Sequence, residues 1–177
     1  MKNLLGGAPA PSFEDPLEML EACHGRILAQ FATLKKLLQH LPVHGCDTQA
    51  QQAAKAVLRY FDTAGQYHHQ DEEQDLFPVL LSTQNAEAHA LVRRLLDDHK
   101  VMEAAWAHLR PLLLAVAEGQ GASLETAAVE NLIAAYEPHI VMENTQLFPL
   151  SAQLLSGTQL EALGRSMAAR RGVAVAG

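Results

Sequence analysis

Two stretches of the chain repeat apolar residues at alternating steps of three and four, and one histidine interrupts each stretch. The first is formed by Leu17, Leu20, His24, Ile27, Phe31, Leu34 and Leu38. The second is formed by Val92, Leu95, His99, Met102, Trp106, Leu109 and Leu113. Such steps place side chains along one face of an α-helix, as on the inward face of a bundle helix. Because alternation of the strand type is absent, the pattern predicts an all-α protein.

Turn and capping residues divide this pattern into four long helices and a short fifth one. Helix starts are expected at or near Asp15, Asp47, Asn85, Ser123 and Thr158. Helix ends are expected near Pro42, Leu81, Glu118 and Gly172. We therefore expect an up-down-up-down four-helix bundle over residues 15–172, with a short C-terminal fifth helix. Residues 1–14, rich in Gly, Ala and Pro, are expected to form a flexible arm.

The second and fourth expected helices share one motif. It reads His68-x3-Glu72-x3-Leu76-Phe77-Pro78 in the first copy and His139-x3-Glu143-x3-Leu147-Phe148-Pro149 in the second. A spacing of four residues stacks the imidazole and the carboxylate on one helix face, one turn apart. Such a pair chelates metal. Two pairs in one small chain therefore indicate a site for one or two transition-metal ions.

The stripe histidines and the motif residues are expected to reach one level of the bundle. Counted from the connection between their helices, His24 and His68 lie within about four residues of one height, roughly 6 Å. The second hairpin places its two histidines at a common height in the same way. The expected metal ligands are therefore His24, His68, Glu72, His99, His139 and Glu143.

A plainer interpretation exists for each of these residues. A lone histidine on an apolar helix face is usually a hydrogen-bonded core residue. However, burying four histidines and two carboxylates without metal would cost on the order of several kcal/mol, which favours the metal interpretation. His69 and Glu73 have the same spacing as the motif pair, but they align with Ile140 and Asn144 of the second copy. We therefore expect them beside the site or at the surface.

Other residues of potential chemical interest have less specific expectations. The histidines without a motif partner, expected to face solvent, are His40, His44, His89 and His108. Cys23 is expected to be a small packing residue, and Cys46 to be exposed in a loop. Tyr136 either approaches the metal site or, as favoured, packs in the core with its hydroxyl hydrogen-bonded.

Charge and composition exclude several classes of protein. The 177 residues carry a formal net charge of −7, which disfavours sequence-independent nucleic-acid binding. No apolar run approaches the roughly 18 residues of a membrane span, and no secretory signal is apparent at the start. Two cysteines do not make a disulfide framework and fit a reducing compartment. We therefore expect a cytoplasmic protein that binds neither nucleic acid nor membrane.

At the doubled motif the chain resembles the hemerythrin-like, HHE cation-binding family, and the resemblance covers about residues 15–150. It implies a non-haem di-iron centre with an oxo or hydroxo bridge, in which zinc could substitute for iron. The terminal ligands that it implies are His24, His68, His99 and His139, and the bridging ligands are Glu72 and Glu143. Glu103 stands where the oxygen-carrying members have a fifth histidine, so simple oxygen carriage is not expected. We favour a solvent-facing Glu103 over one that faces the metal.

Three functions compete at this stage. The first is a di-iron protein that binds or senses dioxygen, nitric oxide or peroxide, with little or no catalysis. The second is a di-iron oxidase or a peroxide-consuming enzyme. Oxidases of the ferritin type have mostly carboxylate ligands and Glu-x-x-His spacing, unlike this His-rich chain. The third is an iron buffer or a metal-responsive interaction module. No protein partner is assigned.

Overall fold

The computed structural model describes residues 10–121 and 123–174, and every regular element in this part of the chain is helical. The long helices are α1 (Pro16–His44), α2 (Thr48–Asp62), α5 (Ala86–Ala117) and α6 (Thr126–Met142). The segments that continue α2 are α3 (Ala64–Gln70), η1 (Asp71–Leu76) and α4 (Phe77–Ser82). Those after α6 are η2 (Glu143–Leu147), α7 (Phe148–Leu154) and α8 (Gly157–Arg170). The prediction of an all-α protein is confirmed.

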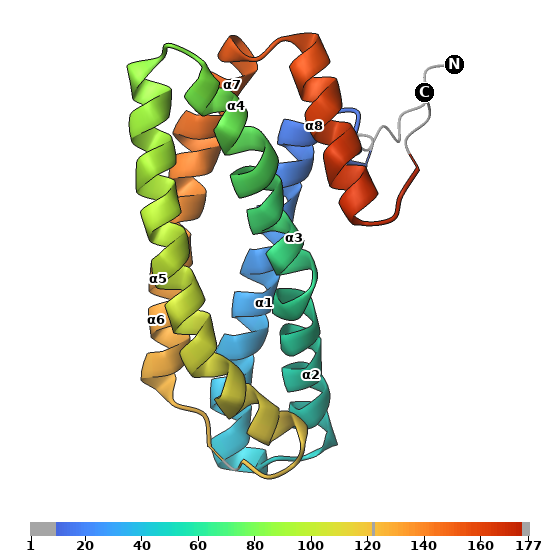
Figure 1. Cartoon of the computed structure of the whole chain (residues 1–177). Helices are drawn as coiled ribbons and strands as arrows, with labels where there is room; N and C mark the ends of the chain where they lie inside the picture. The colour runs from blue at the N-terminus through green and yellow to red at the C-terminus, as the bar shows by residue number, and fades with distance from the viewer. Residues whose placement is uncertain (1–9, 122, 175–177) are drawn as a thin grey trace, which may run out of the picture.

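The helices form an elongated bundle. In Figure 1, α1, the stretch from α2 to α4, α5, and the stretch from α6 to α7 lie side by side, and α8 lies at one end. Helix α5 packs against α2 and α6, and α1 packs against the same two helices. Helix α8 packs against α1 and η1. No helix in the described ranges is both long and apolar enough to cross a membrane.

A layer of polar residues divides the apolar interior into two clusters. On α1, His24 lies between Leu20 and Ile27, which belong to different clusters. Helix α5 repeats this arrangement around His99. The polar layer is thus covered by packed apolar side chains on both sides along the bundle axis. Water is excluded there, so the polar groups in the layer must find their partners within the protein.

Both copies of the motif contain a short π-helical segment, which the sequence pattern did not predict. Segment η1 begins directly before Glu72, and η2 begins at Glu143. Each segment is followed by the Phe-Pro pair of the motif. A proline inside a helix has no N–H to donate and its ring clashes with the carbonyl four residues earlier, so the helix widens there. The motif proline favours the wider turn that carries each glutamate, but it is not sufficient, because Pro111 and Pro138 lie inside helices that stay α-helical.

Several expected helix boundaries are wrong by a few residues. Helix α1 passes Pro42 and ends before Gly45, whose φ of 68° no L-residue adopts easily. Helix α6 begins after Glu125 rather than at Ser123. Ser156, not Thr158, caps α8. Its side chain accepts a hydrogen bond from the Gln159 backbone N–H, and the Gln159 side chain accepts one from the Ser156 backbone N–H. The second long stretch is also broken at Thr63.

Charged residues attach the last helix to the bundle. Asp71 is completely buried and pairs with Arg170 and Arg171 at the end of α8. The Arg171 guanidinium also lies over the rings of Phe13 and Tyr67, 5.7 and 5.5 Å from their centroids. Residues 1–9 of the expected arm lie outside the described residues. Helix α8 is thereby fixed to the residue that precedes Glu72.

Candidate metal centre

The structure brings together all six residues that the sequence indicated. They come from six different segments: His24 from α1, His68 from α3, Glu72 from η1, His99 from α5, His139 from α6 and Glu143 from η2. None of the six is more than 2% exposed. They form the polar layer between the two apolar clusters.

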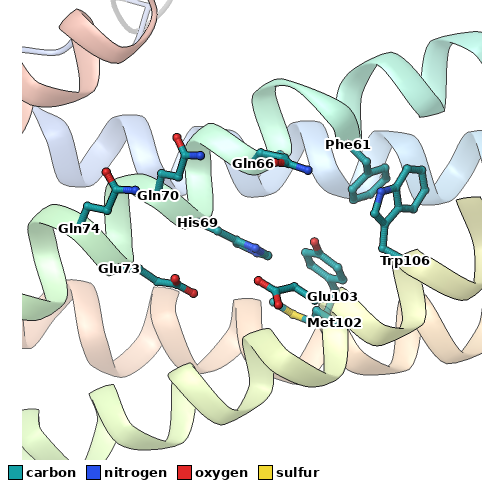
Figure 2. A pocket seen from close by; sticks show the side chains of 11 residues that line it. Phe61, Gln66, His69, Gln70, Glu73, Gln74, Met102, Glu103 and Trp106 are labelled. Carbon is teal, nitrogen blue, oxygen red and sulfur yellow. The ribbon is translucent and has the colours of Figure 1, made fainter.

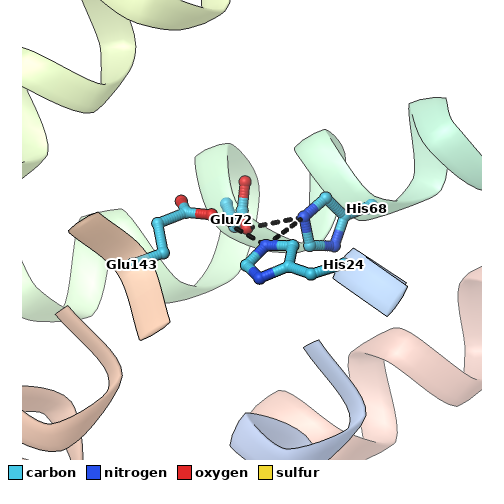
Figure 3. Close-up of side chains that lie close together, drawn as sticks. All are labelled: His24, His68, Glu72 and Glu143. Atoms are coloured by element: carbon cyan, nitrogen blue, oxygen red, sulfur yellow. Dashed lines mark hydrogen bonds and ion pairs between the residues drawn. The ribbon is translucent and has the colours of Figure 1, made fainter. Parts of the chain in front are cut away.

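Each of the two glutamates faces a histidine of both hairpins. The Oε1 atom of Glu72 lies 3.1 Å from His68 Nε2, and its Oε2 atom lies 3.2 Å from His99 Nε2. Glu143 repeats this with His24 at 2.9 Å from Oε2 and His139 at 3.2 Å from Oε1. Figure 3 shows four of these residues converging on one point. The two carboxylates therefore lie between two pairs of histidines, one pair from each hairpin: His24 with His68, and His99 with His139.

The six side chains form two overlapping groups, each of which could hold one metal ion. The first group contains His24, His68 and both glutamates, and the second contains His99, His139 and both glutamates. Within each group the potential ligand atoms lie within 4.8 Å of one another. Both groups share the same two carboxylates, which is the arrangement that two bridged ions require.

The hydrogen bonding of these atoms fits a bound cation. All four carboxylate oxygens of Glu72 and Glu143, and the Nε2 atoms of His99 and His139, have no hydrogen-bond partner in the described part of the protein. Buried acceptors without partners are costly, and they become favourable when a cation lies between them. Imidazole nitrogen together with carboxylate oxygen suits iron and zinc.

Residues 15–151 match the hemerythrin HHE cation-binding domain. The chain belongs to the hemerythrin HHE cation-binding family. A protein of Haemophilus influenzae described as uncharacterized is 30% identical over 162 residues, which cover 92% of this chain and 93% of that protein. The resemblance drawn from the doubled motif is confirmed, and a cation-binding role agrees with the clustered histidines and glutamates.

Charge and burial oppose one another in this HHE site. Burial lowers the pKa of His24, but the Glu143 carboxylate beside it outweighs this effect and holds the pKa above its usual value. The same balance raises the pKa of His139. At His68, burial and then the neighbouring His24 hold the pKa well below the usual value, so the ring is neutral. Burial also raises the pKa of Glu72 well above the carboxyl range, with the neighbouring Glu143 adding to it.

Two further side chains orient the histidines of the HHE site. His24 Nδ1 donates to Asn144 Oδ1 at 2.6 Å, and His99 Nδ1 donates to Glu73 Oε1 at 2.6 Å. With the proton on Nδ1, the Nε2 lone pair of each ring is directed into the site. The alignment of the two motif copies had placed Glu73 beside the site or at the surface; in the structure it contacts a candidate ligand. Sequence analysis named Asn144 only as the residue that aligns with Glu73 and gave it no role at the site.

Asp98 was missed by sequence analysis. Its Oδ2 atom lies 3.6 Å from Nδ1 of His139, too far for a hydrogen bond, and its Oδ1 atom accepts a hydrogen bond from Arg94 Nε at 3.0 Å. The available signal was its position directly before His99, because a residue next to an inward-facing histidine can reach the neighbouring helix.

A cavity of about 460 Å³ opens beside the HHE site (Figure 2). Its lining includes His69, Glu73, Glu103, Trp106 and Tyr136. The His69 ring stacks on His99 with centroids 4.1 Å apart, and on Tyr136 at 5.9 Å. Glu103 is exposed at this cavity, as the sequence analysis favoured. The cavity therefore reaches His69, whose ring separates it from His99.

Some minor expectations need correction. His40 and His89 are half-buried rather than solvent-facing, while His44 and His108 are exposed. The His40 ring donates to Asp47 Oδ1 at 2.9 Å, and the His89 ring donates to the carbonyl of Thr83 at 2.8 Å. Both histidines lie near helix ends, where the adjoining turn supplies an acceptor.

The two cysteines also differ from each other. Cys46 is half-buried, not exposed, and its thiol donates to the carbonyl of Val116. Cys23 is buried and packs as expected. Both are free thiols.

Proposed function

We propose that this protein holds two iron ions at the centre of an up-down-up-down four-helix bundle. His24 and His68 bind one ion, His99 and His139 bind the other, and Glu72 and Glu143 bridge the two. The observation that carries this proposal is the division of each carboxylate, with one oxygen toward each histidine pair. Membership of the HHE cation-binding family supports it.

We propose further that the centre binds or senses dioxygen, nitric oxide or peroxide. A non-haem di-iron centre supplies open coordination positions and one-electron redox chemistry. Four histidines and two glutamates leave room for such a ligand. The cavity that reaches His69, whose ring stacks on His99, supports the approach of a small molecule, which a simple iron buffer would not need. The apolar clusters on either side keep bulk water away from the centre.

The surrounding residues suit binding more directly than they suit turnover. Asn144 and Glu73 hold the His24 and His99 rings with their Nε2 atoms toward the centre. Phe148 stacks on the His24 ring with centroids 5.5 Å apart, and Phe77 stacks on the His99 ring at 5.8 Å. These contacts fix ring orientation before any metal enters, so little conformational entropy is lost on binding.

The test is metal content followed by spectroscopy. Protein expressed with ample iron and purified without oxygen is expected to contain about two irons per chain. Its Mössbauer and electronic spectra should change on addition of nitric oxide or dioxygen. A stable content of one zinc and no iron, even after anaerobic reconstitution with iron, would contradict the proposal. Zinc is the relevant competitor because the general affinity order does not favour iron.

The same sample distinguishes the alternative functions. Disappearance of peroxide in large excess over the iron content would favour the enzyme. Spectra that respond to none of the three ligands would favour the iron buffer or the interaction module. Under the proposed function, ligand binding is expected to be stoichiometric with the di-iron centre.

A further inference from the structure

We infer that the two iron positions are electronically unequal, and that Glu73 makes the iron held by His99 and His139 the one that prefers the ferric state. This inference rests on the proposed di-iron function. It concerns the partners of the histidine rings rather than the six candidate ligands. The two halves of the chain repeat one another, so any difference between matched positions is informative.

The first difference lies at matched positions directly after the two glutamates. Glu73 follows Glu72, and Asn144 follows Glu143. Each of the two side chains accepts a hydrogen bond from a histidine of the opposite hairpin, and both distances are 2.6 Å. The geometry is therefore the same in the two halves, but the acceptor is a carboxylate in one and a neutral amide in the other.

The second difference lies directly before the two stripe histidines. Asp98 stands before His99, and its carboxylate lies 3.6 Å from His139 Nδ1. Cys23 takes the matched position before His24. His68 Nδ1 has no hydrogen-bond partner among the residues that the structure describes. His99 and His139 thus have two carboxylates near them, although Arg94 Nε also donates to Asp98 Oδ1 at 3.0 Å and offsets part of that charge. His24 has the neutral amide of Asn144 instead.

Carboxylate partners change what an imidazole ligand can do. An anion that accepts the Nδ1–H bond makes the ring a more basic, more electron-rich ligand. A more electron-rich ligand and a nearby negative charge both stabilise the ion of higher charge. The Glu73 side chain is 37% exposed, so solvent reduces its charge effect, but the direct hydrogen bond to His99 remains.

The iron position with the stronger preference for the ferric state, held by His99 and His139, is also the one on the side of the cavity. Glu73 lines the cavity, and His69, which stacks on His99, lines it as well (Figure 2). A small ligand in this cavity would therefore lie on the side of the iron that gives up an electron more readily, with the His69 ring between it and His99. The other iron lies nearer to the neutral partners.

The experiment uses two isosteric changes and one matched control in the iron-loaded protein. Glu73→Gln removes the charge at His99 and keeps an acceptor. Asn144→Asp adds a charge at His24. Glu103→Gln removes a carboxylate from the same cavity, but no hydrogen bond links Glu103 to an imidazole in the described structure. The readout is the pair of one-electron midpoint potentials, followed by EPR of the mixed-valence state.

Glu73→Gln and Asn144→Asp should each reduce the difference between the two midpoint potentials, the first by raising the lower potential and the second by lowering the higher one. Glu73→Gln should raise the lower potential, with at least a tenfold loss of ferric preference, about 59 mV for one electron. Asn144→Asp should lower the higher potential by a similar factor. Glu103→Gln should leave this difference unchanged. Asn144→Asp removes no hydrogen bond, so it keeps the inference testable if Glu73→Gln loses iron.

Two kinds of failure can be told apart. Suppose that wild-type protein holds two irons. If neither change alters the difference between the two midpoint potentials, or if Glu103→Gln reduces it as much as Glu73→Gln does, the inference is overturned and the di-iron function stands. If wild-type protein does not load two irons, the proposed function falls and the inference falls with it.

Discussion

The attachment of α8 through Asp71 permits a prediction of stability. Asp71 is completely buried, and its carboxylate accepts bonds from Arg171 Nη1 at 3.1 Å and Nη2 at 2.6 Å. Arg170 donates to the same carboxylate. The arginine side chains are only 14% and 17% exposed. Asp71→Asn keeps the shape of the side chain and removes its charge.

The expected loss in the free energy of unfolding depends on which partners the two arginines keep after Asp71→Asn. Removing one partner from a buried ion pair costs about 3–5 kcal/mol. Arg170 keeps Asp75 as a partner at 2.7 Å, and the new amide oxygen still accepts one bond, so the lower end applies. We expect a loss of about 3 kcal/mol in the free energy of unfolding. For a chain of this size that is a fall of about 6–12 °C in melting temperature.

The assay is urea and thermal unfolding with a metal chelator present, so that metal binding does not contribute. The matched control is Glu161→Gln, which breaks an exposed pair with Arg165 on the same helix. That pair is 3.8 Å long and exposed on both sides, so its loss should cost no more than about 1 kcal/mol. Equal, small losses from both changes would refute the reasoning that α8 is fixed by a buried charge.

Two further predictions concern the candidate metal centre. His68→Ala should lose metal and destabilise the bundle, because the buried glutamates lose the cation that compensates their charge, whereas His69→Ala should retain metal. Equal losses in metal content would show that the alignment of the motifs is wrong. Metal affinity should fall as the pH drops from about 8 to about 6, because a protonated imidazole cannot bind metal. The raised pKa values of His24 and His139 let protons compete at a higher pH than for a free imidazole. Equilibrium dialysis across this range checks the trend, and a constant metal content would contradict it.

The family and the grouping of the six residues could be anticipated because they depend on local periodicity. A step of four residues puts His68 and Glu72 on one face wherever the helix lies. The matched stripes around His24 and His99 then leave only one interior for both motifs to face. The ligand roles and the up-down-up-down order stay predictions.

Errors in the predicted boundaries came from competing local interactions. Thr158 looked like a cap, but Ser156 has Gln159 three residues on, and the reciprocal bonds favour the earlier start. Pro42 looked like a helix end, but a proline near the C-terminus of a helix removes a single hydrogen bond, so the helix continues to His44. His40 was expected to face solvent, and it is half-buried because its acceptor, Asp47, lies in the following turn.

The sequence by itself determined which residues face inward, because helical periodicity is a property of neighbouring residues. Tertiary structure decided which atoms meet. His24 and Asn144 are 120 residues apart, and His99 and Glu73 are 26 apart, so their hydrogen bonds depend on the rotation and level of packed helices. The π-helical turns that carry Glu72 and Glu143 direct one oxygen to each hairpin. No periodicity contains that information, since it depends on where neighbouring helices put their histidines.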